Sequence, residues 1–230
     1  MTRPRRAEVP ATVLIVAKAP VPGFAKTRLT PPLTPLEAAR LAAAALLDTL
    51  TAAHASGVRN LMVAWTGDLE QAEAAADIAA ALREFTVVPQ RGETFGQRLA
   101  NAHADAARFG QPVLQIGMDT PQAGPELLTT AAAALPTGTA ALGPAADGGW
   151  WALGLSDPRP ARALADIPMS TSRTGELTRN MLQQHGYRVH RLPILTDVDD
   201  FPAALSVASE VTGRFADAVR SLPAARLVSS

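Results

Sequence analysis

The sequence contains no cysteine. This absence excludes disulfide bonds, metal sites with thiolate ligands and a cysteine nucleophile. A chain without disulfides suits a reducing compartment, so we expect a cytoplasmic protein. An excess of charge is also missing, because 21 lysines and arginines balance 21 aspartates and glutamates. A neutral chain lacks the positive field that attracts phosphate backbones, which argues against a nucleic-acid partner bound by bulk electrostatics.

Long apolar runs are absent as well. No stretch approaches the ~20 consecutive apolar residues that a membrane span needs, so we expect none. Residues 1–10 are basic and contain proline, and no apolar signal-peptide core follows them. We therefore expect a short disordered leader at 1–10 and a frayed tail at 223–230.

Alternating strand and helix patterns fill residues 11–222. Short apolar runs predict strands at 12–17, 58–65, 85–89, 113–118, 139–143, 150–155 and 187–195. Helical patterns lie between most of them, including an alanine-rich one that ends near 83, and 200–220 is predicted as one helix. This alternation predicts a single α/β domain with a mainly parallel sheet, to which strands 139–143 and 150–155 add an antiparallel extension.

The stretch AKAPVPGFAKTRL at 17–29 follows the first predicted strand. It places Lys18, Lys26 and Arg28 within eleven residues at a strand end. Three such cations can neutralise a polyphosphate, with help from backbone amides in the turn at Gly23 and from Thr27. The competing interpretation is three solvated surface cations.

Carboxylates follow two other strands. Asp119 stands where strand 113–118 ends, and ligands of open α/β sheets bind outside the carboxyl ends of strands. Asp197 and Asp199 are two residues apart in an extended segment, so they project to one side while Val198 faces the core. Asp200 is the expected N-cap of the next helix. Asp119, Asp197 and Asp199 can hold Mg²⁺ or Mn²⁺. The competing interpretation is that they are ordinary turn and cap residues.

Two loops offer further binding residues. Asp147, Gly148 and Gly149 combine a carboxylate with paired glycines, which let backbone approach a ligand closely; a hairpin turn explains the same residues. Ser170 and Thr171 precede a helix and can bind a phosphate or simply cap that helix.

Weaker signals come from the remaining polar and aromatic residues. The stretch at 90–98 is polar and contains glycine, which would suit contacts with a nucleobase. Trp150 and Trp151 are expected in the core or in a pocket wall. The histidines are scattered, mostly on predicted helix surfaces, and receive no role; they are His54, His103, His185 and His190.

Four motifs together resemble a known family. They are AKAPVPGFAKTRL at 17–29, GMDTP at 117–121, GPAADGGWWALGL at 143–155 and LTDVDDFPAAL at 195–205. In this order they resemble the bacterial GT-A-fold family of glycosyltransferase- and nucleotidyltransferase-like proteins related to 2-phospho-L-lactate guanylyltransferase. The resemblance implies a three-layer nucleotide-diphospho-sugar-transferase-like sandwich, a divalent cation and chemistry at a nucleotide phosphate. It departs at Met169, where the family often has Trp, and at Asp200, where it often has Thr.

Three hypotheses follow for function. In the first, a nucleotidyltransferase holds a nucleoside triphosphate on Lys18, Lys26 and Arg28 with Mg²⁺ or Mn²⁺ on the aspartates, and an ionised phosphorylated small-molecule acceptor attacks without a general base. In the second, a glycosyltransferase uses a nucleotide-sugar, and Asp147 is the candidate base. The third is a non-catalytic nucleotide-binding domain. The nucleobase, the acceptor and the oligomeric state stay open.

Overall fold

The computed structural model describes residues 8–223. Within them the chain forms one seven-stranded sheet in the order β3-β2-β1-β4-β6-β5-β7. The strands are β1 Val9–Lys18, β2 Val58–Thr66, β3 Thr86–Pro89, β4 Val113–Gly117, β5 Thr139–Pro144, β6 Trp150–Leu155 and β7 Arg188–Arg191. Most of the expected leader lies outside the described residues, as does most of the expected tail, and the leader's last two residues, Val9 and Pro10, begin β1.

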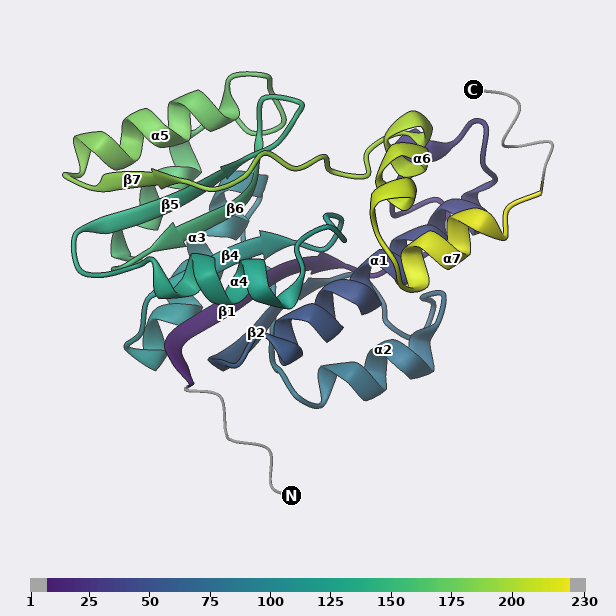
Figure 1. Cartoon of the computed structure of the whole chain (residues 1–230), viewed down its shortest axis with the longest axis horizontal. Coiled ribbons are helices and arrows are strands. Elements are labelled where there is room, and N and C mark those ends of the chain that lie inside the picture. The colour runs from purple at the N-terminus through teal and green to yellow at the C-terminus, as the bar shows by residue number, and fades with distance from the viewer. Residues whose placement is uncertain (1–7, 224–230) are drawn as a thin grey trace.

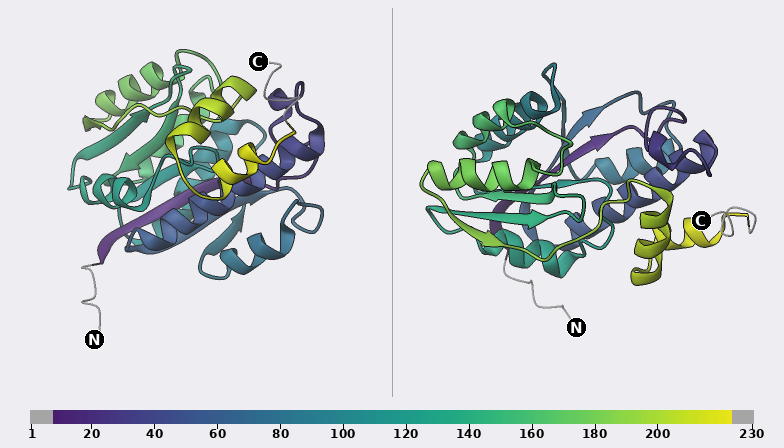
Figure 2. Two further views of the ribbon diagram at one scale, coloured as in Figure 1. Left: turned by 45° about the vertical axis from the view of Figure 1, so that its right-hand side comes forward. Right: turned by 90° about the horizontal axis from the view of Figure 1, so that it is seen from above.

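Helices cover both faces of this sheet (Figures 1 and 2). They are α1 Pro35–Ala55, α2 Ala75–Leu82, α3 Phe95–Ala106, α4 Pro125–Ala133, α5 Thr174–Gln184, α6 Phe201–Glu210 and α7 Arg214–Arg220, with 3₁₀ turns η1 Thr27–Leu29, η2 Ala107–Phe109 and η3 Arg159–Asp166. The predicted mainly parallel α/β fold is confirmed, with helices on both faces of one sheet (Figure 1). No helix among residues 8–223 combines the length and apolar character of a membrane span.

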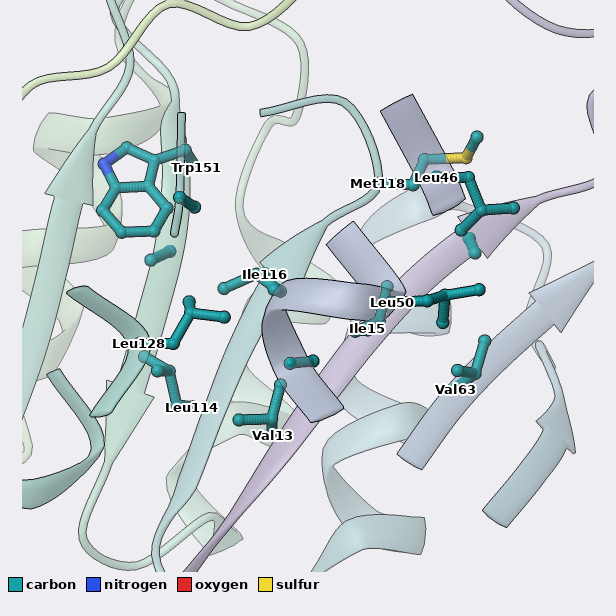
Figure 3. Close-up of a cluster of buried hydrophobic side chains, with 14 of the residues drawn as sticks. Val13, Ile15, Leu46, Leu50, Val63, Leu114, Ile116, Met118, Leu128 and Trp151 are labelled. Carbon is teal, nitrogen blue, oxygen red and sulfur yellow. The ribbon is translucent and has the colours of Figure 1, made fainter. Parts of the chain in front are cut away.

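The core is divided by the sheet, because successive side chains of a strand point to opposite faces. Val13 and Ile15 of β1 pack with Leu46 and Leu50 of α1 on one face, as Figure 3 shows. Leu14, between them in sequence, packs on the other face with residues of α3 and α5. A third cluster joins the remaining face of α1 to α6 and α7, at the opposite end of the molecule from α5 (Figure 1).

The only antiparallel strand among the described residues is β6. It pairs antiparallel with both β4 and β5, whereas β5 pairs parallel with β7. The predicted antiparallel pair is therefore confirmed, but β6 lies inside the sheet instead of extending it. The short loop at 145–149 turns the chain back, and this position brings the loop to the same end of the sheet as the end of β4.

Helix α1 begins at a capping box formed by Thr34 and Glu37. Thr34 accepts a hydrogen bond from the Glu37 amide at 3.2 Å, and the Glu37 carboxylate accepts one from the Thr34 amide at 2.7 Å. Each side chain thus satisfies an amide that the first helical turn leaves free. Asp200 caps α6 as predicted, since its carboxylate accepts from the Ala203 amide at 2.8 Å.

Three elements differ from those predicted from the sequence. The helix expected over 200–220 is broken into α6 and α7, because Val211 is extended and Gly213 has a φ of 125°. The strand expected over 187–195 ends at Arg191, and Pro193 beyond it has no N–H for a sheet ladder. Residues 192–200 instead cross the molecule in extended form toward α6 (Figure 1). The alanine-rich helix does not begin until Ala75, after a stretch of turns.

Candidate active site

A cleft of about 700 Å³ opens at the carboxyl ends of β1 and β4. The position follows from the parallel sheet, whose strand ends and following loops meet at one edge. The residues singled out from sequence that line the cleft are Lys18, Lys26, Thr27, Arg28, Asp119, Asp147, Gly149, Ser170, Asp197 and Asp199.

Lys26 joins the cationic loop to two aspartates. Its ammonium lies 2.6 Å from Asp119 and 3.0 Å from Asp199, and its side chain is only 11% exposed. Burial opposes the charged form of Lys26, but Asp119 and Asp199 outweigh burial and raise its pKa. Arg28 lies 3.5 Å from Asp199 on the solvent side. Two of the three cations expected to meet phosphate, Lys26 and Arg28, are thus paired with carboxylates.

The C-terminal aspartates reach the cleft as the alternation predicts. Val198 is buried with α6 and α7, while Asp197 and Asp199 line the cleft. The Val198 amide donates to the Asp119 carbonyl at 3.0 Å, which ties this segment to the end of β4. Burial, together with the nearby Asp119, raises the pKa of Asp197 to about 7, although the Thr120 hydroxyl donates to Asp197 at 3.0 Å.

The donor atoms suit a divalent cation, but they do not form a finished metal centre. Among residues 8–223, no three His, Cys, Asp or Glu side chains are grouped as a metal site. The ammonium of Lys26 lies between Asp119 and Asp199, which shows that this point attracts a cation. Carboxylate oxygens are the donors that Mg²⁺ and Mn²⁺ prefer. The carboxylates of these aspartates are therefore suitable ligands for such an ion. In this structure the Lys26 ammonium supplies the positive charge between Asp119 and Asp199.

Lys18 differs from Lys26 in its surroundings. Its ammonium lies 3.8 Å above the ring centroid of Phe24, a cation–π contact. Burial, and then the charge of Arg98, lower the pKa of Lys18. Arg98 belongs to the polar stretch at 90–98 and lines the cleft, as do Gln90 and Phe95 from the same stretch.

Three of the expected binding residues do not line the cleft. Gly23 forms a turn with a φ of 76° at the tip of the cationic loop. Gly148 lies against the neighbouring loop, and a Cβ there would meet the Ser172 carbonyl oxygen at 2.2 Å. The Thr171 hydroxyl accepts from the Arg173 amide at 3.3 Å in a turn before α5, and it does not cap that helix, whose N-cap position is Arg173. The absence of a side chain at Gly148 thus lets the backbone of the loop at 145–149 pack against the backbone at Ser172, instead of against a ligand.

The sequence analysis assigned no role to Gln115 or His103, which form a buried polar pair beside the cleft. Gln115 lies in the middle of β4 and lines the cleft. His103, expected on a helix surface, is fully buried, and its Nε2 lies 3.0 Å from Gln115 Oε1. Burial lowers the pKa of His103 to about 4, so the ring is neutral at pH 7. A polar residue within the apolar run of a buried strand is the signal that could have revealed this pair.

Trp150 and Trp151 lie where they were expected, in the wall of a pocket or in the core. Both line the cleft, and Trp151, with 2% of its surface exposed, also belongs to the core. The Trp150 indole N–H donates to the Thr178 hydroxyl at 3.1 Å, which fixes the ring against α5. The β6 side of the cleft is therefore a rigid wall.

Comparison with protein families gives one match. The model of a family of uncharacterized proteins conserved in bacteria, DUF2064, matches residues 49–171. The chain belongs to this family. The matched part includes Asp119 and the loop at 145–149 but neither the cationic loop nor the C-terminal aspartates. No curated protein matches the sequence.

Solved structures share the fold of this DUF2064 protein. A provisionally named nucleotide-diphospho-sugar transferase from Desulfovibrio desulfuricans G20 is 24% identical, with a TM-score of 0.80 over 91% of this chain and 94% of that one. A nucleotidyl transferase from Methanothermobacter is 17% identical, with a TM-score of 0.57 over 92% and 99%. Rv0371c of Mycobacterium tuberculosis H37Rv, solved in complex with manganese, is 19% identical, with a TM-score of 0.56 over 87% and 99%.

Proposed function

We propose that this protein is a metal-dependent nucleotidyltransferase. It would move a nucleoside monophosphate from a nucleoside triphosphate to a small phosphorylated acceptor and release pyrophosphate. The observation that carries this proposal is the meeting of Lys26 with Asp119 and Asp199 at the carboxyl edge of the sheet, where three segments distant in sequence converge. A cleft of about 700 Å³ is large enough for a nucleotide.

Nucleotidyl transfer requires that the charge of the triphosphate is neutralised and that the acceptor is aligned with the α-phosphorus. A phosphate oxygen of the acceptor attacks the α-phosphorus, a new P–O bond forms, and the bond to the bridging oxygen of the β-phosphate breaks. The pyrophosphate leaves with the electron pair of that bond. The attacking oxygen is already ionised, so no general base is needed. Lys18, Lys26 and Arg28 would stabilise the negative charge that moves onto the leaving group.

Three of the cleft's aspartates would hold Mg²⁺ or Mn²⁺, namely Asp119, Asp197 and Asp199. Such an ion, when bound, neutralises phosphate oxygens and orients the triphosphate. Asp119 and Asp199 also accept hydrogen bonds from Lys26 and hold it in place. A manganese complex of Rv0371c and a nucleotidyl transferase from Methanothermobacter, both of this fold, support the proposal. A relation to 2-phospho-L-lactate guanylyltransferase is part of the same proposal.

A glycosyltransferase is the second candidate. Asp147 lines the cleft and could accept a proton from an acceptor hydroxyl, although its carboxylate also accepts from the Gly149 amide at 2.8 Å. The similarity to the Desulfovibrio protein favours a nucleotide-sugar as the donor in this case. A non-catalytic nucleotide-binding domain would explain the cleft but not the gathering of carboxylates in it.

A thermal-shift panel separates these candidates. Each nucleoside triphosphate and several nucleotide-sugars are added with and without Mg²⁺ or Mn²⁺. A ligand at 100 times its Kd stabilises the fold by about 2.7 kcal/mol. Metal-dependent stabilisation by one triphosphate, followed by pyrophosphate release with a phosphorylated acceptor, supports nucleotidyl transfer. Stabilisation by a nucleotide-sugar alone supports glycosyl transfer.

Asp119→Asn tests the metal assignment. The amide keeps the size of the side chain but removes its charge, so metal-dependent triphosphate binding should be lost while the fold remains. Asp77→Asn is the matched control, because Asp77 is exposed on α2 outside the cleft. Wild-type metal-dependent binding by Asp119→Asn would contradict the proposal.

A further inference from the structure

The four cations that line the cleft fall into two classes. Lys26 and Arg28 contact aspartates. Lys18 and Arg98 make no ion pair with any carboxylate of residues 8–223, although both line the same cleft. Lys18 and Arg98 therefore supply the positive charge in the cleft that no carboxylate of the described residues neutralises.

Arg98 is held by backbone and not by charge. Its Nε donates to the Gly92 carbonyl at 3.3 Å and its Nη2 to the Glu93 carbonyl at 3.2 Å. These bonds orient one edge of the guanidinium and leave Nη1, with two donors, unused. Gly92 is suited to this loop, since its φ is 129° and a Cβ there would meet Gln97 at 2.8 Å. The loop is thus built to present a fixed guanidinium at the cleft.

Lys18 is held in a similar way, by an uncharged partner. The Phe24 ring fixes the ammonium at 3.8 Å and accepts no hydrogen bond of ordinary strength from it, so its donors remain available to a ligand. Arg98 is close enough for its charge to contribute, after burial, to the lowered pKa of Lys18. Two like charges that approach each other in a partly buried cleft cost free energy, which a bound anion would offset.

We propose that Lys18 and Arg98 form a phosphate-binding position separate from the cluster of Lys26 with Asp119 and Asp199. Its identification as part of a nucleotide site rests on the proposed function, but its affinity for phosphate groups does not. An arginine fork and an ammonium together match the oxygens of a phosphate group. This group would belong to the triphosphate or to the phosphorylated acceptor. Lys26, already bonded twice, serves the aspartates first.

The test uses inorganic tripolyphosphate as the probe, with its Kd measured by calorimetry on the full chain without nucleotide. Arg98→Gln and Lys18→Met should each weaken binding by about tenfold or more, because a charge-assisted hydrogen bond is lost. Arg91→Gln is the matched control. Arg91 belongs to the same loop but is paired with Asp105 at 2.8 Å and does not line the cleft. Its Kd should change by less than about twofold.

A second variant guards against a local loss of structure. Arg98→Lys keeps the charge but not the fork, so its affinity should lie between those of the wild type and Arg98→Gln. Unchanged tripolyphosphate affinity in Arg98→Gln, an equal loss in Arg91→Gln, or no binding by the wild type would each overturn the proposal. Competition of orthophosphate against tripolyphosphate identifies the source. A loss confined to tripolyphosphate supports the triphosphate chain, and an equal loss for orthophosphate supports a single phosphate such as that of the acceptor.

The two proposals fail in different ways. Tripolyphosphate binding that depends on Arg98, without turnover of any triphosphate, would support the phosphate position and contradict nucleotidyl transfer. Turnover with unchanged kcat and KM in Arg98→Gln would contradict the phosphate position and leave nucleotidyl transfer supported.

Discussion

At the scale of single residues, the charge balance of the cleft depends on Lys26. The single ammonium of Lys26 forms ion pairs with both Asp119 and Asp199. Asp197, whose pKa is raised, lies near them. Lys26 itself has a φ of 51°, a left-handed conformation that is uncommon for a residue with a side chain. The aspartates therefore hold a lysine whose backbone is placed at some cost.

Replacing Lys26 with methionine should destabilise the fold and make it respond to metal. The variant leaves carboxylates together without their cation, and we expect a loss of about 1–3 kcal/mol, below the value for a fully buried pair because Asp199 is half-exposed. Mn²⁺ should then raise the Tm of Lys26→Met more than that of the wild type. Thermal unfolding with and without Mn²⁺ measures both effects.

The control for this substitution is Arg40→Met. Arg40 pairs with Glu73 at 3.2 Å on the surface, where its side chain is 62% exposed. Exposed pairs of this kind contribute about 0–1 kcal/mol, and no response to Mn²⁺ is expected. A Tm of Lys26→Met that is insensitive to Mn²⁺ would show that the aspartates do not bind a divalent ion.

His103 should make stability depend on pH. Its pKa is lowered by burial to about 4 in the folded state, against 6.5 for a free histidine. The unfolded chain therefore binds a proton first as the pH falls, so stability is constant above about pH 7 and decreases between about pH 6.5 and pH 4. From pH 7 to pH 5 this residue alone accounts for a loss of about 2 kcal/mol.

Urea unfolding of the wild type and of His103→Gln at pH 7 and pH 5 measures this contribution. The variant keeps a polar partner for Gln115 but has no titrating ring. Its stability should therefore decrease by about 2 kcal/mol less than that of the wild type over the same interval. An equal decrease in both proteins would mean that the buried ring is not the source.

At the scale of elements, α7 is attached to the domain by a cap from another helix. Gly213 has no side chain to cap α7, and Asp48 of α1 accepts from the Arg214 and Phe215 amides at 3.1 and 2.8 Å. Asp48→Ala should cost about 1–3 kcal/mol, because it leaves two helix N-terminal amides without an acceptor. Hydrogen exchange of the α7 amides should rise with it.

Asp48→Asn is the control for this substitution. The amide retains one acceptor oxygen and the shape of the side chain, so about half of the loss is expected. Exchange in α3, on the other face of the sheet, should not change in either variant. Equal exchange of α7 in the wild type and Asp48→Ala would show that packing alone holds this helix.

Helix α1 and the loop at 145–149 show what sequence can predict about elements. The cap at Thr34 was predictable because its two partners are three residues apart. The role of Gly148 was not, because its neighbour Ser172 is far away in sequence and approaches only when two loops pack. The break between α6 and α7 depends in the same way on Asp48, which receives the amides exposed by the break.

At the scale of the whole molecule, the three core clusters share elements. Strand β1 contributes Ile15 to one face and Leu14 to the other, and α1 contributes to the first and third clusters. No cluster can be exposed without disturbing another. We therefore predict a single cooperative unfolding transition, with equal calorimetric and van't Hoff enthalpies, as expected for one domain. A separate early transition would indicate that α6 and α7 unfold on their own.

The sequence alone determined the α/β class, the mainly parallel sheet and the edge at which the candidate site lies. These follow from local patterns: apolar runs, caps and the alternation that turns Asp197 and Asp199 away from the core. Only the tertiary structure decided how charges are shared. Lys26 meets Asp119 across 93 residues of sequence, whereas Lys18 and Arg98 keep no carboxylate partner among the described residues. Coulomb interactions depend on distance in space, and pairing between segments far apart in the chain exists only once the sheet has brought their ends together.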